Sequence, residues 1–134
     1  MKNETNPKKM PDSAPTLRIV PMPADTNAYG DIFGGWLLSQ MDLAGASAAT
    51  KLVKQRVVTV GINGMNFHNP VFVGDEVSFF TDITRIGRTS ITAHIQAWAR
   101  ARDEEDYQSR MVTEGVYTFV AIDENRKPME IKKS

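Results

Sequence analysis

The period of the apolar residues changes once along this sequence, and that change limits the possible folds more than any other feature. Residues 34–54 follow the 3.6-residue period of a helix. Residues 56–123 follow the two-residue period of strands and are rich in β-branched side chains. One long helix followed by several strands predicts an α+β domain, in which the helix packs against an antiparallel sheet.

Five strands are predicted around this helix. Gly61 and Gly64 indicate a bulge or bend in the second of them. Short links such as "IGRTS" favour hairpins, so the last four strands are predicted to form a meander. One helix covers only part of one face of such a sheet, and a homo-oligomer is therefore expected to protect the rest and the edges. The predicted strands cover residues 16–22, 56–70, 73–87, 88–101 and 107–123.

Asp42 is the residue of the helix that most needs an explanation. With about 100° per residue, it lies in the middle of a stripe that is predicted to pack against the sheet. A carboxylate on a packed face is costly unless it has a partner or a function, so Asp42 is a candidate catalytic residue. The stripe is also made of small side chains, which let a helix lie close to a sheet. Its members are Leu38, Gly45, Ala46, Ala49 and Val53.

The composition argues against several classes of protein. With 16 basic and 16 acidic residues the formal net charge is zero, which argues against nucleic-acid binding and against electrostatic binding to membranes. There is no cysteine, so disulfides, a Cys nucleophile and a Cys-ligated zinc site are excluded. Residues 1–15 are predicted to be a disordered tail without the apolar core of a signal peptide. No apolar run approaches the length of a membrane helix, and a cytoplasmic protein is expected.

Three motifs carry a resemblance to a known family: "MPADTNAYGDIFGGWLLSQMDLAG", "FHNPVFVGDEV" and "IGRTSI". Together they resemble the acyl-CoA thioesterases of the hot-dog superfamily, most closely the YciA-like bacterial acyl-CoA hydrolases, over residues 17–125. The resemblance implies a hot-dog domain at 16–125, with a long central helix wrapped by a five-stranded antiparallel sheet. Residues 126–134 are then a charged, frayed C-terminal tail. Two such sheets would join in a dimer, and three dimers in a hexamer.

The resemblance also implies the substrate and the centre of the site. The substrate would be an acyl-CoA thioester, with coenzyme A as part of the substrate rather than a cofactor, and with no metal. Asn27, in the loop before the helix, would act together with Asp42 of a neighbouring subunit. The backbone N–H near Gly35, where the helix begins, would hold the thioester oxygen.

The chemistry of thioester hydrolysis fits these residue types. The sequence has neither a Cys nor a G-x-S-x-G nucleophile motif, and His68 and His94 lie on separate predicted strands. Asp42 is therefore expected to act as a general base on water or as a nucleophile, and the sequence leaves both open. Asn27 is expected to orient the water. Unpaired N–H groups at a helix start favour the negative charge that develops on the thioester oxygen.

Seven further residues are candidates for binding the substrate, each with a simpler structural explanation beside it. Gly34 would let the carbonyl approach the backbone closely. Asp31 is an acid at the helix start or a group near the thioester, and Phe33 lines the acyl tunnel or packs. Arg85 and Arg88 are solvated hairpin charges or contacts to the CoA phosphates. The last two, which start a strand or bind the tail of coenzyme A, are Thr89 and Ser90.

Two other functions stay open beside hydrolysis. A hot-dog hydratase or dehydratase needs a histidine together with an acid at the site, and neither histidine lies in the loop–helix segment. A non-catalytic acyl-CoA-binding module would bind coenzyme A without turnover. The presence of both Asn27 and Asp42 favours hydrolysis over both alternatives.

Overall fold

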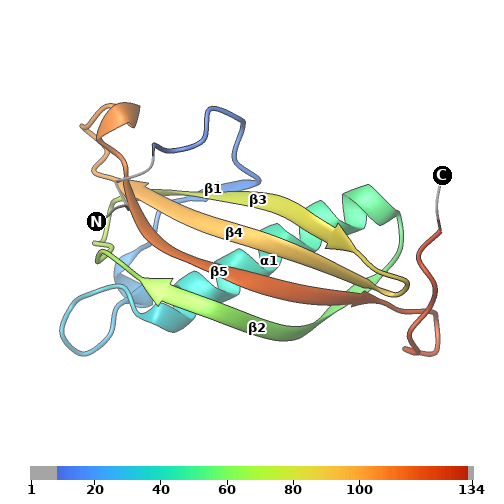
Figure 1. Ribbon diagram of the computed structural model, residues 1–134. Helices are drawn as coiled ribbons and strands as arrows, with labels where there is room; N and C mark the ends of the chain where they lie inside the picture. The colour runs from blue at the N-terminus through green and yellow to red at the C-terminus, as the bar shows by residue number, and fades with distance from the viewer. Residues whose placement is uncertain (1–8, 133–134) are drawn as a thin grey trace.

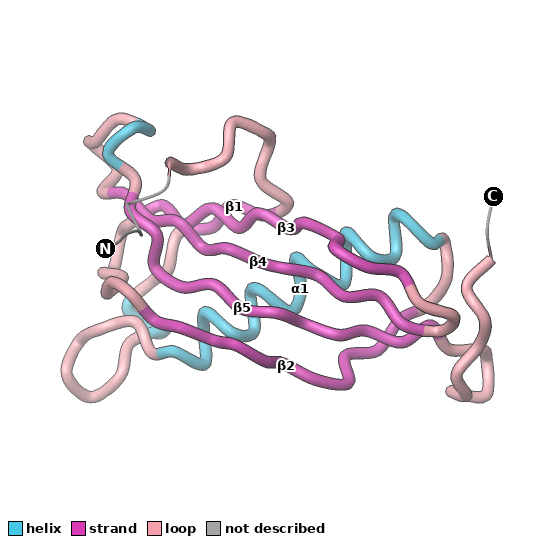
Figure 2. Tube along the Cα trace, viewed as in Figure 1, coloured by secondary structure: helices cyan, strands magenta, loops and turns pink. Residues whose placement is uncertain are grey.

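The computed structural model describes residues 9–132 of the chain. In this range one long helix, α1 (Gly34–Val53), lies across one face of a five-stranded antiparallel sheet (Figures 1 and 2). The predicted α+β arrangement is therefore confirmed. The strands are β1 (Leu17–Ile19), β2 (Val57–Phe67), β3 (Glu76–Ile86), β4 (Ser90–Arg100) and β5 (Arg110–Ala121).

The strands lie in the order β1-β3-β4-β5-β2. The predicted meander is correct for β3, β4 and β5 but wrong for β2, which pairs with β5 and not with β3. The segment 68–75 is too long for a hairpin and takes the chain from β2 to the other side of β4 and β5. As a result β5 is an interior strand, with a neighbour on each side, and β2 is an edge strand.

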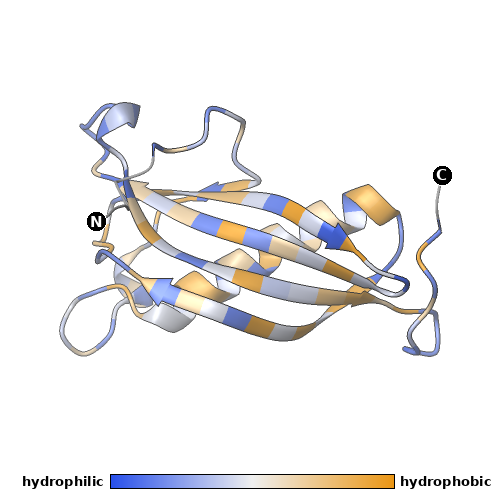
Figure 3. Ribbon diagram, in the orientation of Figure 1, coloured by the Kyte–Doolittle hydropathy of each residue, from blue (hydrophilic) through white to orange (hydrophobic). Residues whose placement is uncertain are grey.

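The helix packs closely on the inner face of the sheet. The alternation along β4 puts Ile91, Ala93 and Ile95 on that face, each fully buried, as predicted. Figure 3 shows the bands of hydrophobic and hydrophilic residues that alternate along the strands of the sheet. A Cβ atom added to Gly45 of α1 would lie 2.6 Å from Cδ1 of Ile95 and 2.8 Å from Cζ of Phe119. A larger residue here would push Ile95 and Phe119 aside, so the small residues of the helix do bring it close to the sheet.

The buried face of α1 is rotated from the predicted stripe. Met41 is fully buried in the core, whereas Leu38 and Asp42 are half-buried. The prediction that Asp42 occupies the middle of the packed face is therefore wrong. Consecutive helical residues point about 100° apart, so this correction moves the carboxylate to the side of the face and towards β2. The buried helix residues are Trp36, Leu37, Met41, Ala44, Gly45, Ala49 and Val53.

Strand β2 leaves one long edge of the sheet unpaired among the described residues. Its register with β5 shifts between Thr59 and Gly61 and between Asn63 and Asn66, which confirms the predicted irregularities near the two glycines. Large apolar side chains are nevertheless exposed on it: Val60 by 58%, Ile62 by 42% and Phe67 by 54%. An exposed apolar edge strand offers unused N–H and C=O groups to another strand.

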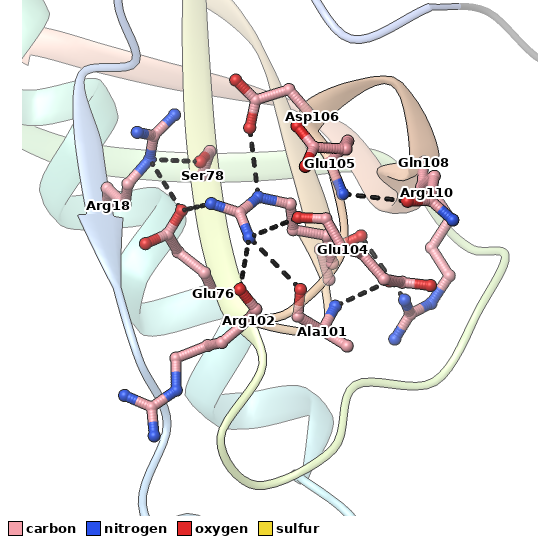
Figure 4. Close-up of polar contacts among 12 residues, drawn as sticks. Arg18, Glu76, Ser78, Ala101, Arg102, Glu104, Glu105, Asp106, Gln108 and Arg110 are labelled. Carbon is pink, nitrogen blue, oxygen red and sulfur yellow. Dashed lines mark hydrogen bonds and ion pairs between the residues drawn. The ribbon is translucent and has the colours of Figure 1, made fainter.

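Arg100, the last residue of β4, fixes the loop 101–109 at the end of the sheet. Its partners Glu76, Asp106 and Glu104 are labelled in Figure 4. Its Nη2 lies 2.8 Å from Oε1 of Glu76, and its Nε lies 3.1 Å from Oδ1 of Asp106. Asp106 begins the short 3-10 helix η2 (Asp106–Gln108). The Nη1 of Arg100 donates to the carbonyl oxygens of Ala101, Arg102 and Glu104.

The C-terminal tail departs from what the sequence suggests, whereas the N-terminal tail is described only in part. The part of the predicted disordered tail at 1–8 lies outside the described residues, and 9–15 form an irregular segment that lies beside Phe80. The prediction of a frayed C-terminal tail is wrong for residues 126–132. Ile131 is buried in the core, and its N–H donates to the carbonyl oxygen of Arg88. The side chain of Gln55, just after α1, bonds the backbone of Glu130 and Lys132.

Candidate active site

Asp42 has a defined partner across the gap between α1 and the edge strand. The hydroxyl of Thr59, on β2, donates a hydrogen bond of 2.5 Å to Oδ1 of Asp42. Hydrogen bonds to a carboxylate are shorter and stronger than neutral ones, and this one fixes the carboxylate's position. The second oxygen, Oδ2, has no such partner among the described residues. One hydrogen bond thus orients the Asp42 carboxylate, and its Oδ2 is available to accept a proton or to attack.

Tyr117 of β5 lies beneath the same turn of the helix. Its side chain is fully buried, and its hydroxyl donates 2.8 Å to the carbonyl oxygen of Leu38. Burial raises the pKa of Tyr117 well above its usual range, and the nearby charge of Asp42 raises it further. Tyr117 is therefore neutral at physiological pH and ties the helix to the sheet one turn before Asp42.

The start of α1 is uncapped. The N-cap residue is Phe33, which has no side-chain oxygen to accept a backbone hydrogen bond. Its own N–H donates to the carbonyl oxygen of Asp25, and that of Trp36 donates to Phe33. Within residues 9–132 the N–H groups of Gly34 and Gly35 have no acceptor. Two free donors at the positive end of a 20-residue helix suit an oxyanion.

Asn27 organises the loop in front of this helix start. Its side-chain Oδ1 accepts from the N–H of Tyr29 at 2.9 Å and from that of Asp31 at 3.2 Å. Its own N–H donates to the carbonyl oxygen of Asp31. With the oxygen occupied, the exposed amide nitrogen is left to donate outward. Asp31 closes this loop, and because Phe33 is the N-cap, the predicted N-cap role of Asp31 is wrong.

One protomer does not bring the predicted catalytic groups together. Gly35 and Asp42 are seven positions apart on α1, which places them about 10 Å apart along the helix axis at 1.5 Å per residue. A base and an oxyanion donor must each lie about 3 Å from atoms of one reacting group. Within one protomer, Asp42 is therefore too far along the helix to serve the donors at its start.

The predicted hairpin residues lie at the opposite end of the molecule from the helix start (Figure 1). Arg85 and Arg88 are exposed beside the β3–β4 turn, near the end of α1. The backbone oxygens of Thr89 and Ser90 accept from the N–H groups of Ala121 and Gly87, where β4 begins at Ser90. Their contact with coenzyme A stays a prediction. These four residues do not meet Asn27 or Gly35 within one protomer.

The two histidines lie elsewhere. His68 and His94 each place Nε2 near the carboxylate of Glu114, at 3.2 Å and 3.0 Å. Glu114 pairs with Gln96, whereas its neighbour Thr113 pairs with Ala97 and is fully buried with it on the face towards α1. Successive residues of a strand point to opposite faces, so Glu114 is on the sheet face that points away from α1 and Asp42. Among residues 9–132 there is no group of three or more acidic or histidine side chains that could hold a metal ion. No helix in that range is long and apolar enough to cross a membrane.

Thr59 was not foreseen from the sequence. It lies two positions after Val57 and therefore on the same face of β2, which is the face towards the helix. A hydroxyl among the apolar β-branched residues Val57, Val58 and Val60 is the signal that could have found it. The contact itself depends on the pairing of β2 with β5 and not with β3.

Comparison with known proteins places this geometry in a family. The family model of the Thioesterase superfamily matches residues 29–105, which include the helix, Asp42 and Thr59. The chain belongs to the Thioesterase superfamily. The acyl-CoA thioester hydrolase YciA of Salmonella typhimurium is 45% identical over 119 residues, which cover 88% of this chain and 90% of that protein. The predicted membership of the YciA-like group is confirmed.

Solved structures of thioesterases agree with this assignment. A hexameric thioesterase of Yersinia pestis superposes with a TM-score of 0.85 at 44% identity, covering 92% of this chain and 100% of that one. A hexameric hot-dog-fold thioesterase of Campylobacter jejuni superposes with a TM-score of 0.80 at 40% identity, covering 90% and 91%. The predicted hot-dog fold and the prediction of a thioester-hydrolysing enzyme are therefore confirmed.

Proposed function

We propose that this thioesterase hydrolyses acyl-CoA to a carboxylic acid and coenzyme A in a site shared by two subunits. The observation that carries the proposal is the distance between the carboxylate and the oxyanion donors within one protomer. A held carboxylate at Asp42 and two free N–H donors at Gly34 and Gly35 lie on one helix, about 10 Å apart along its axis. Within one protomer, the carboxylate has no oxyanion donor near it, and the donors have no base near them.

A two-fold axis at the middle of β2 supplies the missing groups. Antiparallel pairing of two β2 edges about Ile62 continues the sheet from one subunit into the other and covers the exposed apolar edge. It sets Thr59 of one subunit opposite the Met65–Phe67 end of its partner. Asp42, bonded to Thr59, then faces the partner's helix start and its Asn27 loop.

The same rotation reverses the ends of the two subunits. The partner's β3–β4 turn, with Arg85 and Arg88, then lies at the end where this subunit's helix begins. Two guanidinium groups there suit the phosphates of coenzyme A, since arginine pairs with phosphate in a bidentate manner. The relatives from Yersinia pestis and Campylobacter jejuni are hexameric, which supports the proposal of three such dimers in this protein. The cytoplasmic location stays a prediction.

The chemistry follows from these positions. The thioester oxygen accepts from the N–H groups of Gly34 and Gly35, which stabilise its negative charge as the carbonyl carbon is attacked. Asp42 removes a proton from the attacking water, which the Asn27 amide orients. The C–S bond then breaks, and the proton passes to the departing thiolate. If Asp42 attacks directly, an acyl–aspartyl anhydride forms, and water hydrolyses it to the same products.

Thiol release from a panel of acyl-CoAs tests the proposal. Asp42→Asn should lower kcat at least a hundredfold, because the amide neither accepts the proton nor attacks. Asp82→Asn is the matched control, since Asp82 is an exposed acid on β3, and it should retain the wild-type rate. Wild-type protein that binds acyl-CoA without releasing thiol would instead be an acyl-CoA-binding module. An Asp42→Asn rate within a few-fold of wild type would refute the role of Asp42.

A further inference from the structure

Tyr117 gives α1 a hydrogen bond that the packing of the core does not require. Its side chain is fully buried between β5 and the helix, and its ring stacks on that of Phe119, with 6.2 Å between the ring centroids. Phe119 fills the next inward position of β5 without a hydroxyl and is buried just as completely. A buried hydroxyl costs free energy unless it is bonded, so a second phenylalanine would fill this space more simply.

The acceptor of this hydroxyl connects Tyr117 with the candidate active site. The hydroxyl donates to the carbonyl oxygen of Leu38 at 2.8 Å. In a continuous α-helix the carbonyl of one residue accepts the N–H of the residue four positions later, and four positions after Leu38 comes Asp42. One carbonyl oxygen, which has two lone pairs, thus bonds both the hydroxyl of Tyr117 and the N–H of Asp42.

Two neighbouring strands therefore hold Asp42 from two sides. Strand β2 bonds its side chain through Thr59, and strand β5 fixes its backbone through Tyr117 and Leu38. The two hydroxyls come from nearby positions of the ladder, since Thr59 pairs with Phe119, two residues after Tyr117. Burial raises the pKa of Tyr117, and the charge of Asp42 raises it further, so the phenol lies within electrostatic reach of the carboxylate.

We infer that Tyr117 is a positioning residue for the reaction: its hydroxyl fixes the turn of α1 that carries the carboxylate of Asp42. The inference rests on the proposed function, because Tyr117 acts through Asp42 and touches no substrate. Catalysis depends steeply on the position of a base relative to the reacting carbon, whereas substrate affinity depends mainly on contacts elsewhere. The hydroxyl is therefore expected to act on kcat and not on KM.

Tyr117→Phe removes the hydroxyl and keeps the buried ring. In steady-state thiol release from one acyl-CoA, kcat should fall about fivefold, the factor expected for one hydrogen bond, and KM should stay within about twofold. Ser39→Ala is the matched control, because Ser39 donates at 2.8 Å to another carbonyl of the same helix, that of Trp36, and it should keep the wild-type kcat. Ile95→Val removes a methylene from the contact between helix and sheet, so it should lower Tm without changing kcat.

A double variant separates positioning from a purely structural role. In the Asp42→Asn protein, adding Tyr117→Phe should change the residual kcat by less than about twofold, because no carboxylate is left to position. A Tyr117→Phe protein that keeps the full kcat would overturn the inference and leave the proposed hydrolysis intact. A fivefold loss that recurs in the Asp42→Asn protein would overturn it equally, because Tyr117 would then act independently of Asp42.

Amide hydrogen exchange gives a readout that does not depend on turnover. In Tyr117→Phe, exchange within residues 38–43 should be about fivefold faster than in the wild type, and exchange within residues 46–53 should be unchanged. If the wild type releases no thiol, the proposed hydrolysis fails, and exchange alone then decides the role of Tyr117. Equal exchange of residues 38–43 in both proteins would overturn the inference, and selectively faster exchange would support it.

Discussion

The hydrogen bond from Thr59 to Asp42 gives the sharpest single prediction. Thr59→Val replaces the hydroxyl with a methyl group of similar size and leaves Asp42 without its donor at Oδ1. A hydrogen bond to a charged group contributes about 1.5–3 kcal/mol. Because Asp42 is half-buried and Thr59 is exposed in one protomer, the lower end of this range applies. About 1.4 kcal/mol corresponds to a factor of ten, so kcat/KM should fall about tenfold.

The assay is steady-state thiol release with one medium-chain acyl-CoA, with the oligomeric state checked for each variant. Thr59→Ser keeps a hydroxyl and should stay within about threefold of the wild type. Thr84→Val is the control for removing a strand hydroxyl elsewhere, since Thr84 donates only to the backbone oxygen of Thr92. If Thr59→Val retains the full kcat/KM, or if the serine variant loses as much as the valine variant, then the reasoning about a held carboxylate is refuted.

Three further predictions concern stability. The pKa of Tyr117 is raised in the folded state, so the neutral phenol stabilises the fold up to the ordinary tyrosine pKa of about 10. The stability of the protein should therefore fall as the pH rises above this value. Tyr117→Phe should show a smaller loss of Tm between pH 9 and 11. Asp75 is nearly buried and bonds Arg110 at 2.7 Å, so Asp75→Leu should lower the free energy of unfolding by about 3 kcal/mol. Asp106 is exposed in its pair with Arg100, so Asp106→Leu should lower it by under about 1 kcal/mol. Unchanged urea midpoints for both variants would contradict this. Gly45→Ala should lower the unfolding free energy by about 1–3 kcal/mol because its Cβ would overlap Ile95, and an equal or higher Tm would show that the core can give way.

Sequence patterns predicted the elements of this fold because each pattern is local. The helix at 34–54 and the four long strands follow from periods of 3.6 and 2, which a single stretch of chain carries by itself. The position of β2 does not follow in this way. Whether it pairs with β3 or with β5 depends on contacts between distant segments, and the pattern within residues 56–70 is the same in both cases.

The residues of the site also divide into those that a local pattern predicts and those that depend on contacts between distant segments. Asn27, Asp42 and the donors near Gly35 could be named as candidates from the sequence because a contiguous motif carries them. Thr59 was missed because its contact with Asp42 crosses from the edge strand to the helix. The face of the helix was misjudged because its apolar and small residues run almost all the way round, so the phase was set by packing on the sheet and not by the pattern.

The central claim is that Asp42 of one subunit works with Asn27 of another, and mixed oligomers test it most directly. Asp42→Asn and Asn27→Ala proteins, each measured alone, should be nearly inactive. After joint denaturation and refolding in equal amounts, half of the dimers are mixed, and each mixed dimer has one site with both residues intact. The account therefore predicts a return of about one-quarter of the wild-type activity. If the mixture stays as inactive as its components although mixed dimers have formed, then each site lies within one subunit, and the shared site is contradicted.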